Sequence, residues 1–233
     1  MPHPPADWFE TLPTGRCLAE FSLWSANLIA LDQDLIRVGA RADIYHIDVA
    51  DGAFAPSLLF FPDLVAALRK RTAIPFHVHL MTDDAILMAQ VDQFAEAGAD
   101  LISVHIENRN APKALARIRS HGLRTGVVLR VETPVDSVTP VVETLDFLTL
   151  LGTRIGVKGQ GLDPSAPARL HEAGRLIAGR SRAGRCVLAA DGGIREETVP
   201  LLVAAGAQTV VLGSLAYGAA DLDARIQWLH GLR

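Results

Sequence analysis

The chain has 233 residues, of which 49% are hydrophobic and 21% charged, and its formal net charge is -4. This length allows one globular domain with a full core, and the slightly acidic balance argues against nucleic-acid binding through bulk electrostatics. We expect neither a membrane span nor a signal peptide, because the sequence has no long apolar run and no basic start before an apolar segment. Two distant cysteines, Cys17 and Cys186, indicate a reducing compartment, so we expect a cytoplasmic protein.

The first 17 residues are rich in proline and polar residues and include Trp8 and Phe9. We expect residues 1–17 to form an N-terminal extension. It either makes one helical turn against the bottom of the fold or remains a partly ordered tail. The main domain then covers residues 18–233.

From residue 18 onwards the sequence repeats one unit. An apolar run is followed by a polar or glycine-containing break and then by a stretch with helical spacing. Strands are predicted over residues 18–23, 44–49, 76–80, 101–106, 126–129, 147–151, 186–190 and 209–212. Helices are predicted near residues 32–39, 62–71, 84–98, 112–121, 135–144, 164–179, 196–206 and 221–232.

Most of the predicted strands are apolar on both faces, which is typical of a parallel sheet covered by helices. Eight strands alternating with eight helices predict a fold of the α/β class, a closed (β/α)8 TIM barrel. An open, doubly wound sheet is the alternative architecture. The segment Phe21-Ser22-Leu23-Trp24-Ser25 argues against it, because no glycine-rich dinucleotide fingerprint follows the first strand.

Polar side chains gather at the C-terminal ends of the predicted strands, where a TIM barrel places its chemistry. His46 and Asp48 end the second strand and point to the same side of it, because side chains alternate along a strand. The third strand carries His77 and His79, and Asp191 follows the seventh. With one of the two third-strand histidines, these residues form a nitrogen and oxygen set that suits Zn²⁺, Mn²⁺ or Fe²⁺. Each has an ordinary structural explanation alone, but together they favour a site.

Glycines follow the seventh and eighth strands, as Gly192-Gly193 and Gly213-Ser214. In a TIM barrel, backbone N–H groups at these two places commonly hold a phosphate. The alternative is that the glycines only allow tight turns.

The sixth strand leads into a flexible loop, residues 152–161, that carries Arg154 and Lys158. We expect both cations to reach the substrate or its phosphate, unless both are solvated surface charges. His105 and Glu107 end the fourth strand, and we assign them a supporting role at most.

Taken together, these segments resemble the ribulose-phosphate 3-epimerase family. In order from the first strand to the eighth, the matching segments are residues 21–27, His46 to Gly52 with Phe54 and Pro56, His79-Leu80-Met81, Gly159-Gln160, Asp191-Gly192-Gly193 and Gly213-Ser214. The resemblance implies a TIM barrel that inverts C3 of a ketose phosphate and assembles as a homo-oligomer. Candidate subunit contacts, which core packing explains equally well, are Trp8, Phe9, Trp228 and Leu232.

Carried over by position, the resemblance implies one divalent metal (Zn, Mn or Fe) and the conversion of ribulose 5-phosphate to xylulose 5-phosphate. The implied metal ligands are His46, Asp48, His79 and Asp191. Asp48 and Asp191 would also be the acid and base that move the proton through an enediolate. The implied substrate contacts are Ser22, Met81, Gly156, Gly159, Gly192, Gly193, Gly213 and Ser214.

The sequence also departs from the family pattern. Ala50 and Leu151 stand where the family has methionines, whereas Met81 is retained. His77 stands where an Asp is usual, and the loop 152–161 lacks the family's Pro-Gly-Phe-Gly-Gly segment. We therefore expect the proton-transfer chemistry to be kept, whereas the substrate remains open to another ketose phosphate, such as allulose 6-phosphate or a tetrulose phosphate.

Two further functions are alternatives to epimerisation. A phosphate-binding barrel can run aldol cleavage or decarboxylation, but decarboxylating relatives use a strand-end lysine, and Lys158 lies in a loop. A non-catalytic barrel that binds a sugar phosphate is the other alternative. The presence of both Asp48 and Asp191 argues against it.

Overall fold

The computed structural model describes residues 2–232, so Met1 and Arg233, the outer ends of the predicted extension and barrel, lie outside them. Within this range eight parallel strands close into a barrel in chain order, which confirms the predicted (β/α)8 fold. The strands are β1 (Leu18–Ser22), β2 (Ile44–Ala50), β3 (Phe76–Met81), β4 (Leu101–His105), β5 (Arg124–Leu129), β6 (Phe147–Leu151), β7 (Val187–Asp191) and β8 (Thr209–Leu212).

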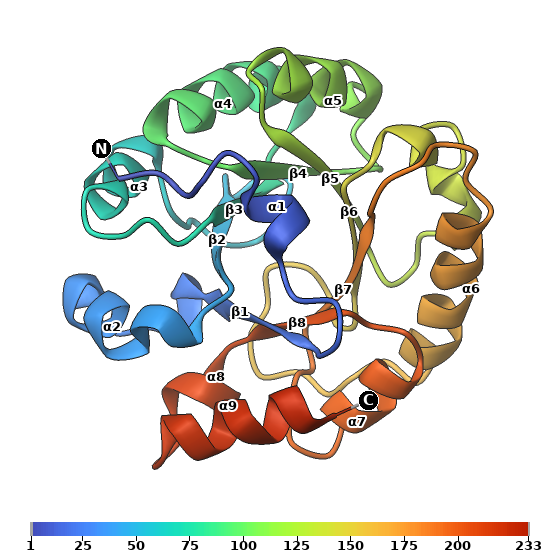
Figure 1. Ribbon diagram of the computed structural model, residues 1–233. Helices are drawn as coiled ribbons and strands as arrows, with labels where there is room; N and C mark the ends of the chain where they lie inside the picture. Colours follow the sequence, from blue (N-terminus) through green and yellow to red (C-terminus); the bar gives the residue numbers. More distant parts are fainter. Residues whose placement is uncertain (1, 233) are drawn as a thin grey trace.

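Helices form a ring outside the barrel (Figure 1). The α-helices are α1 (Trp8–Thr11), α2 (Leu31–Val38), α3 (Pro62–Arg69), α4 (Asp84–Ala97), α5 (Ala111–Ser120), α6 (Ala166–Ala178), α7 (Val199–Ala204), α8 (Ser214–Tyr217) and α9 (Leu222–Gly231). Short 3-10 helices are η1 (Leu23–Ser25), η2 (Gly39–Arg41), η3 (Val135–Val138) and η4 (Val142–Thr144). No helix between residues 2 and 232 combines the length and apolar character that a membrane span requires.

The α-helix predicted over residues 135–144 is wrong. The structure has the two 3-10 helices η3 and η4 there instead, with Pro140 between them. Proline lacks the N–H that a helix interior needs, and its ring clashes with the preceding turn. The β-branched valines and threonines of this segment also lose side-chain freedom in a helix.

Strand β2 shows how one sequence serves both faces of the barrel wall. Tyr45, Ile47 and Val49 belong to the large apolar cluster between strands and helices. The alternate residues His46 and Asp48 are also buried, but they face the barrel interior. The packing of the outer face thereby fixes the register that delivers these two polar side chains to the inside.

The N-terminal segment closes the end of the barrel at which the strands begin. Helix α1 lies over the middle of the barrel in Figure 1, and its Trp8 and Phe9 pack with residues such as Leu18 and Phe147 at the strand starts. Trp8 is 8% exposed and Phe9 is 2% exposed, which favours core packing over a subunit contact for both.

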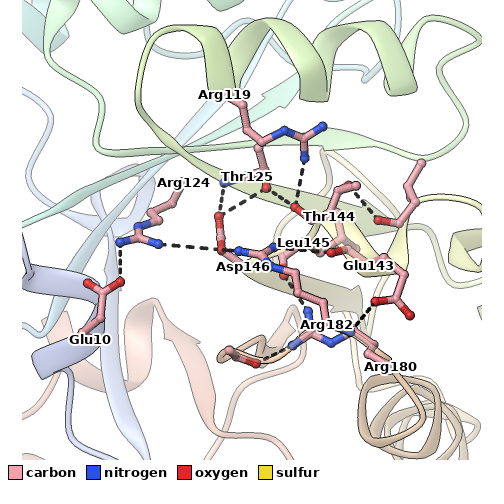
Figure 2. A network of polar contacts seen from close by, with 12 residues as sticks. Glu10, Arg119, Arg124, Thr125, Glu143, Thr144, Leu145, Asp146, Arg180 and Arg182 are labelled. Carbon is pink, nitrogen blue, oxygen red and sulfur yellow. Dashed lines mark hydrogen bonds and ion pairs between the residues drawn. The ribbon is translucent and has the colours of Figure 1, made fainter.

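A polar network surrounds the same end of β5 and β6 (Figure 2). Glu10 pairs with Arg124 at 2.5 Å, which ties α1 to the start of β5. The Asp146 carboxylate accepts a hydrogen bond from the Thr125 backbone N–H at 2.9 Å and lies 3.4 Å from Arg182. Charged groups therefore stabilise the end of the barrel at which the strands begin. The predicted site residues lie at the other end, where the strands finish.

The packing of α1 predicts that Phe9→Ala lowers the free energy of unfolding by about 3 kcal/mol, because it removes a buried aromatic ring. Urea denaturation followed by circular dichroism measures this. Asp7→Ala is the control, since Asp7 is exposed and its side chain makes no cap hydrogen bond, and we expect a change within about 0.5 kcal/mol. Equal stability of both variants would mean that the Phe9 ring does not contribute to the stability of the fold.

Candidate active site

A pocket of about 420 Å³ opens at the C-terminal end of the barrel. Its walls come from the ends of six strands, β1 to β3 and β6 to β8, and from loops that follow them. Every residue predicted to bind metal or substrate lines it except His46, which is fully buried. The lining residues among those predicted are Ser22, Asp48, His79, Met81, Arg154, Gly156, Lys158, Gly159, Asp191, Gly192, Gly193, Gly213 and Ser214.

The four predicted metal ligands converge at the base of this pocket. Asp48 and His79 are paired in the β2–β3 register, His46 lies two residues before Asp48, and Asp191 ends β7. His46 Nε2 is 3.3 Å from Asp48 Oδ1 and 3.9 Å from Asp191 Oδ2. His79 Nδ1 is 3.5 Å and 3.9 Å from the same two oxygens. One ligand atom from each residue therefore faces a common centre, all within 4.8 Å of one another.

The side chains present fit a divalent cation. His46 Nε2 and His79 Nδ1 are buried and have no hydrogen-bond partner among residues 2–232. A tetrahedral ion with bonds of about 2.0–2.2 Å holds its ligand atoms about 3.3–3.6 Å apart. The nitrogen–oxygen distances given above are close to that range, and two unpartnered nitrogens facing two carboxylates are the donor set of such an ion.

The other ring nitrogen of His79 belongs to a chain that ends in a carboxylate. His79 Nε2 lies 2.9 Å from His105 Nε2, and His105 Nδ1 lies 2.9 Å from Glu107 Oε2. Because the carboxylate only accepts, His105 donates from Nδ1 and accepts the Nε2–H of His79. His79 is then left with a free lone pair on Nδ1, which faces the pocket. His105 and Glu107 therefore orient a candidate ligand.

His46 is held by Glu20, a residue that the sequence analysis did not single out. Glu20 Oε1 accepts a hydrogen bond from His46 Nδ1 at 2.7 Å, which leaves the Nε2 lone pair free. Burial alone would raise the pKa of Glu20, but the neighbouring His77 and His46 lower it to about 2. The available signal was a charged residue inside the apolar first strand, two residues before Ser22 and so on the same side.

His77 does not join the four-ligand cluster. Its Nδ1 lies 2.5 Å from Glu20 Oε1 and its Nε2 2.6 Å from Ser103 Oγ, so both nitrogens already have partners. Of the two third-strand histidines that the sequence left open, the structure places His79 at the candidate site.

The two pocket carboxyl groups differ in their affinity for a proton. Burial raises the pKa of Asp191 to about 6, although His46 opposes the shift. Asp48 is buried as well, but the neighbouring His46 and His79 outweigh burial and hold its pKa below the ordinary value. Ser22 Oγ also donates a hydrogen bond to Asp48 Oδ2 at 2.7 Å. Asp48 therefore favours the ionised form, and Asp191 takes up a proton more readily.

The loop after β6 closes one side of the pocket. Lys158 Nζ donates a hydrogen bond to the Trp24 carbonyl at 2.6 Å and lies 4.7 Å from the centre of the Trp24 ring. Burial lowers the pKa of Lys158, against the charge of Asp48. Arg154 is exposed at the rim. Both predicted cations thus border the pocket, with Lys158 fixed against the loop that follows β1.

An apolar wall contains two of the departures from the family pattern. Ala50 packs with Met81 and Ala55, and Ile155 of the sixth loop packs against this cluster. Leu151, the other substituted methionine position, also lines the pocket. Ala50 therefore lies beside the pocket wall, and Leu151 lies on it, paired in the β6–β7 register with Asp191.

The Gly192-Gly193 turn has a backbone that other residues would strain. Both glycines have positive φ, +88° and +69°. A Cβ at Gly193 would lie 2.7 Å from the backbone of Leu162, and one at Gly192 would lie 2.3 Å from Thr153 Oγ1. The close approach of the sixth loop thus explains both glycines, and their backbone also borders the pocket beside Gly213 and Ser214.

Solved structures with the same architecture have other activities. The 3-hexulose-6-phosphate synthase of Salmonella typhimurium superposes with a TM-score of 0.69 over 92% of this chain and 97% of that one, at 16% identity. The orotidine 5'-phosphate decarboxylase of Pyrococcus horikoshii OT3 superposes with a TM-score of 0.64 over 91% and 97%, at 14% identity. At these identities the likeness concerns the fold alone.

Sequence comparison is more specific. The ribulose-phosphate 3-epimerase of Bacillus subtilis (strain 168) is 34% identical over 212 residues, which are 90% of this chain and 96% of that relative. The ribulose-phosphate 3-epimerase of Rhodospirillum rubrum is 36% identical over 191 residues, 82% of each chain. The model of the "Ribulose-phosphate 3 epimerase family" matches residues 18–217, from the first strand to the short helix after the eighth. The chain therefore belongs to the ribulose-phosphate 3-epimerase family of carbohydrate epimerases.

Proposed function

We propose that this protein inverts C3 of a ketose phosphate and interconverts ribulose 5-phosphate and xylulose 5-phosphate. The observation that carries the proposal is the meeting of Asp48 and Asp191 in one pocket with two unpartnered histidine nitrogens. Family membership supports the reaction class. It also leads us to propose that the protein assembles as a homo-oligomer. The two cysteines indicate a reducing compartment, and on that ground we propose a cytoplasmic location.

The two carboxyl groups are proposed to act as base and acid. Epimerisation beside a ketone requires a proton to leave one face of the carbon and another to arrive on the opposite face. Asp48 comes from β2 and Asp191 from β7, strands that are not neighbours in the barrel, so the two groups approach the pocket from different directions. Their different proton affinities suit one group to accept a proton while the other supplies one.

His46, Asp48, His79 and Asp191 are proposed to hold a zinc, manganese or iron ion. Such an ion, when bound, supplies positive charge beside the substrate oxygens on which the enediolate charge develops. Ser22, which donates to Asp48, keeps that carboxylate in place. The buried chain through His105 and Glu107 keeps His79 oriented.

The far side of the pocket is proposed to bind the phosphate. Gly192, Gly193, Gly213 and Ser214 border it and offer backbone N–H groups. Gly156 and Gly159 of the sixth loop and Met81 would bound the sugar. Lys158 would add a positive charge near the phosphate.

A different ketose phosphate is the second candidate substrate. It is favoured by Ala50, Leu151 and Lys158, which depart from the family pattern and lie on or beside the pocket walls. These residues change the shape and charge of the cavity but not its carboxylates. An allulose 6-phosphate or a tetrulose phosphate would therefore undergo the same proton transfers.

We predict that the protein, supplied with Mn²⁺, Fe²⁺ or Zn²⁺ in D₂O, places deuterium at C3 of ribulose 5-phosphate and forms xylulose 5-phosphate. Asp191→Asn should lower the rate at least about 100-fold, since a positioned acid or base contributes about 10²–10⁴-fold. NMR of the product measures both events. Chelation of the metal should abolish the reaction, and re-addition should restore it.

Glu197→Gln is the matched control for this assay. Glu197 follows the same strand but is exposed and does not line the pocket, so the rate should not change. Deuterium exchange that persists in Asp191→Asn would contradict the assigned role. If ribulose 5-phosphate does not react while metal is bound, other ketose phosphates are assayed, and a reaction with one of these favours the second candidate.

We predict that Lys158→Ala raises the Michaelis constant for the phosphorylated ketose about tenfold, the loss expected for one charge-assisted hydrogen bond. The unphosphorylated ketose should be little affected. Steady-state kinetics with both substrates tests this. Lys113→Ala on the exposed face of α5 is the control. Equal effects of Lys158→Ala on both substrates would show that Lys158 does not contact the phosphate.

A further inference from the structure

Two clusters of histidine and carboxylate lie one above the other inside the barrel, and they share His46. In the upper cluster, His46 Nε2 and His79 Nδ1 lie 3.3–3.9 Å from the two carboxylate oxygens, the spacing of ligands around an ion. In the lower cluster, Glu20 Oε1 lies only 2.7 Å from His46 Nδ1 and 2.5 Å from His77 Nδ1. Such distances are those of hydrogen bonds and are too short for two ligands of one metal. The lower cluster is therefore a support for the upper one.

The support consists of side chains from neighbouring strands, and none has an alternative partner in water. Glu20, His46, His77 and Ser103 are all fully buried. One oxygen of Glu20 accepts from both histidines, and His77 reaches on to Ser103 Oγ at 2.6 Å. Gly126 on β5 provides the necessary space, because a Cβ there would lie 1.9 Å from Ser103 Oγ. The network thus spans β1 to β5 beneath the pocket.

The network also gives a physical account of the departure at position 77. The family pattern described above has an Asp at this position, whereas this chain has a histidine. His77 pairs with Glu20 through Nδ1 and with Ser103 through Nε2, so neither ring nitrogen is left to accept a hydrogen bond from His46. The carboxylate next to His46 comes instead from β1. A carboxylate behind a ligand histidine fixes its tautomer and raises its basicity.

We propose that Glu20 is a positioning residue of the metal site, which orients His46 from β1 and takes the place of a carboxylate on β3. His77, which is itself paired with Ser103, holds Glu20 through the shared oxygen. This inference rests on the metal site of the proposed function, but it concerns the affinity for metal and not the reaction.

The test is a titration of the metal-depleted, full-length protein with Mn²⁺ and Co²⁺. Glu20→Ala should weaken the affinity for Mn²⁺ about 10- to 100-fold, the range found for residues behind metal ligands. Glu20→Gln places a carbonyl oxygen where it can accept both hydrogen bonds and removes only the charge, so its loss should be smaller. The visible spectrum of bound Co²⁺ reports the ligand geometry and should change in Glu20→Ala but remain parent-like in Glu20→Gln.

The double variant Glu20→Ala with His77→Asp separates positioning from general stability, because it returns the carboxylate to β3. It should recover most of the Mn²⁺ affinity that Glu20→Ala loses. A double variant no better than Glu20→Ala would overturn the proposal. A Glu20→Gln protein whose Co²⁺ spectrum differs from that of the parent would overturn it as well, and this comparison stands even if Glu20→Ala fails to fold. A parent chain that binds no divalent cation would instead overturn the proposed metal site itself.

Discussion

Ionisable side chains inside a closed barrel must find partners there, because their charges lose the solvation of water at a cost of several kcal/mol each. This constraint organises the interior of the barrel. Glu107 is linked through His105 to His79, and Glu20 directly to His46. Each chain of contacts begins at a carboxylate and ends at a histidine nitrogen without a partner. Both of these unpartnered histidine nitrogens face Asp48 and Asp191, which is where an ion fits.

The barrel and most of its site follow from local pattern. Apolar runs with breaks at regular intervals specify the strands, and alternation places His46 and Asp48 on the inner face of β2. The expected strands over residues 76–80 and 186–190 end one residue later, so that Met81 and Asp191 are the last residues of β3 and β7. The alternation of side chains along each strand therefore decides which residues meet in the site, and the exact residue at which the strand ends does not.

The parts that sequence reasoning missed depend on contacts between distant segments. Glu20 meets His46 only because β1 pairs with β2, a register that no local pattern specifies. The choice between His77 and His79 depends on how far along the barrel axis each side chain lies. The helix expected over 135–144 failed for a local reason, Pro140, which was visible in the sequence. The contact of Lys158 with Trp24 joins two loops, whose paths are set by the whole rim.

The sharing of one Glu20 oxygen by two histidines makes positions 20 and 77 depend on each other. A lineage that exchanged His77 for Asp while keeping Glu20 would bury two carboxylates side by side. One that lost Glu20 while keeping His77 would leave two histidines facing each other without an acceptor. Neither single replacement is neutral, so the two positions are expected to be inherited as a pair. Joint presence of Glu20 and His77 would then mark common descent more reliably than either residue alone.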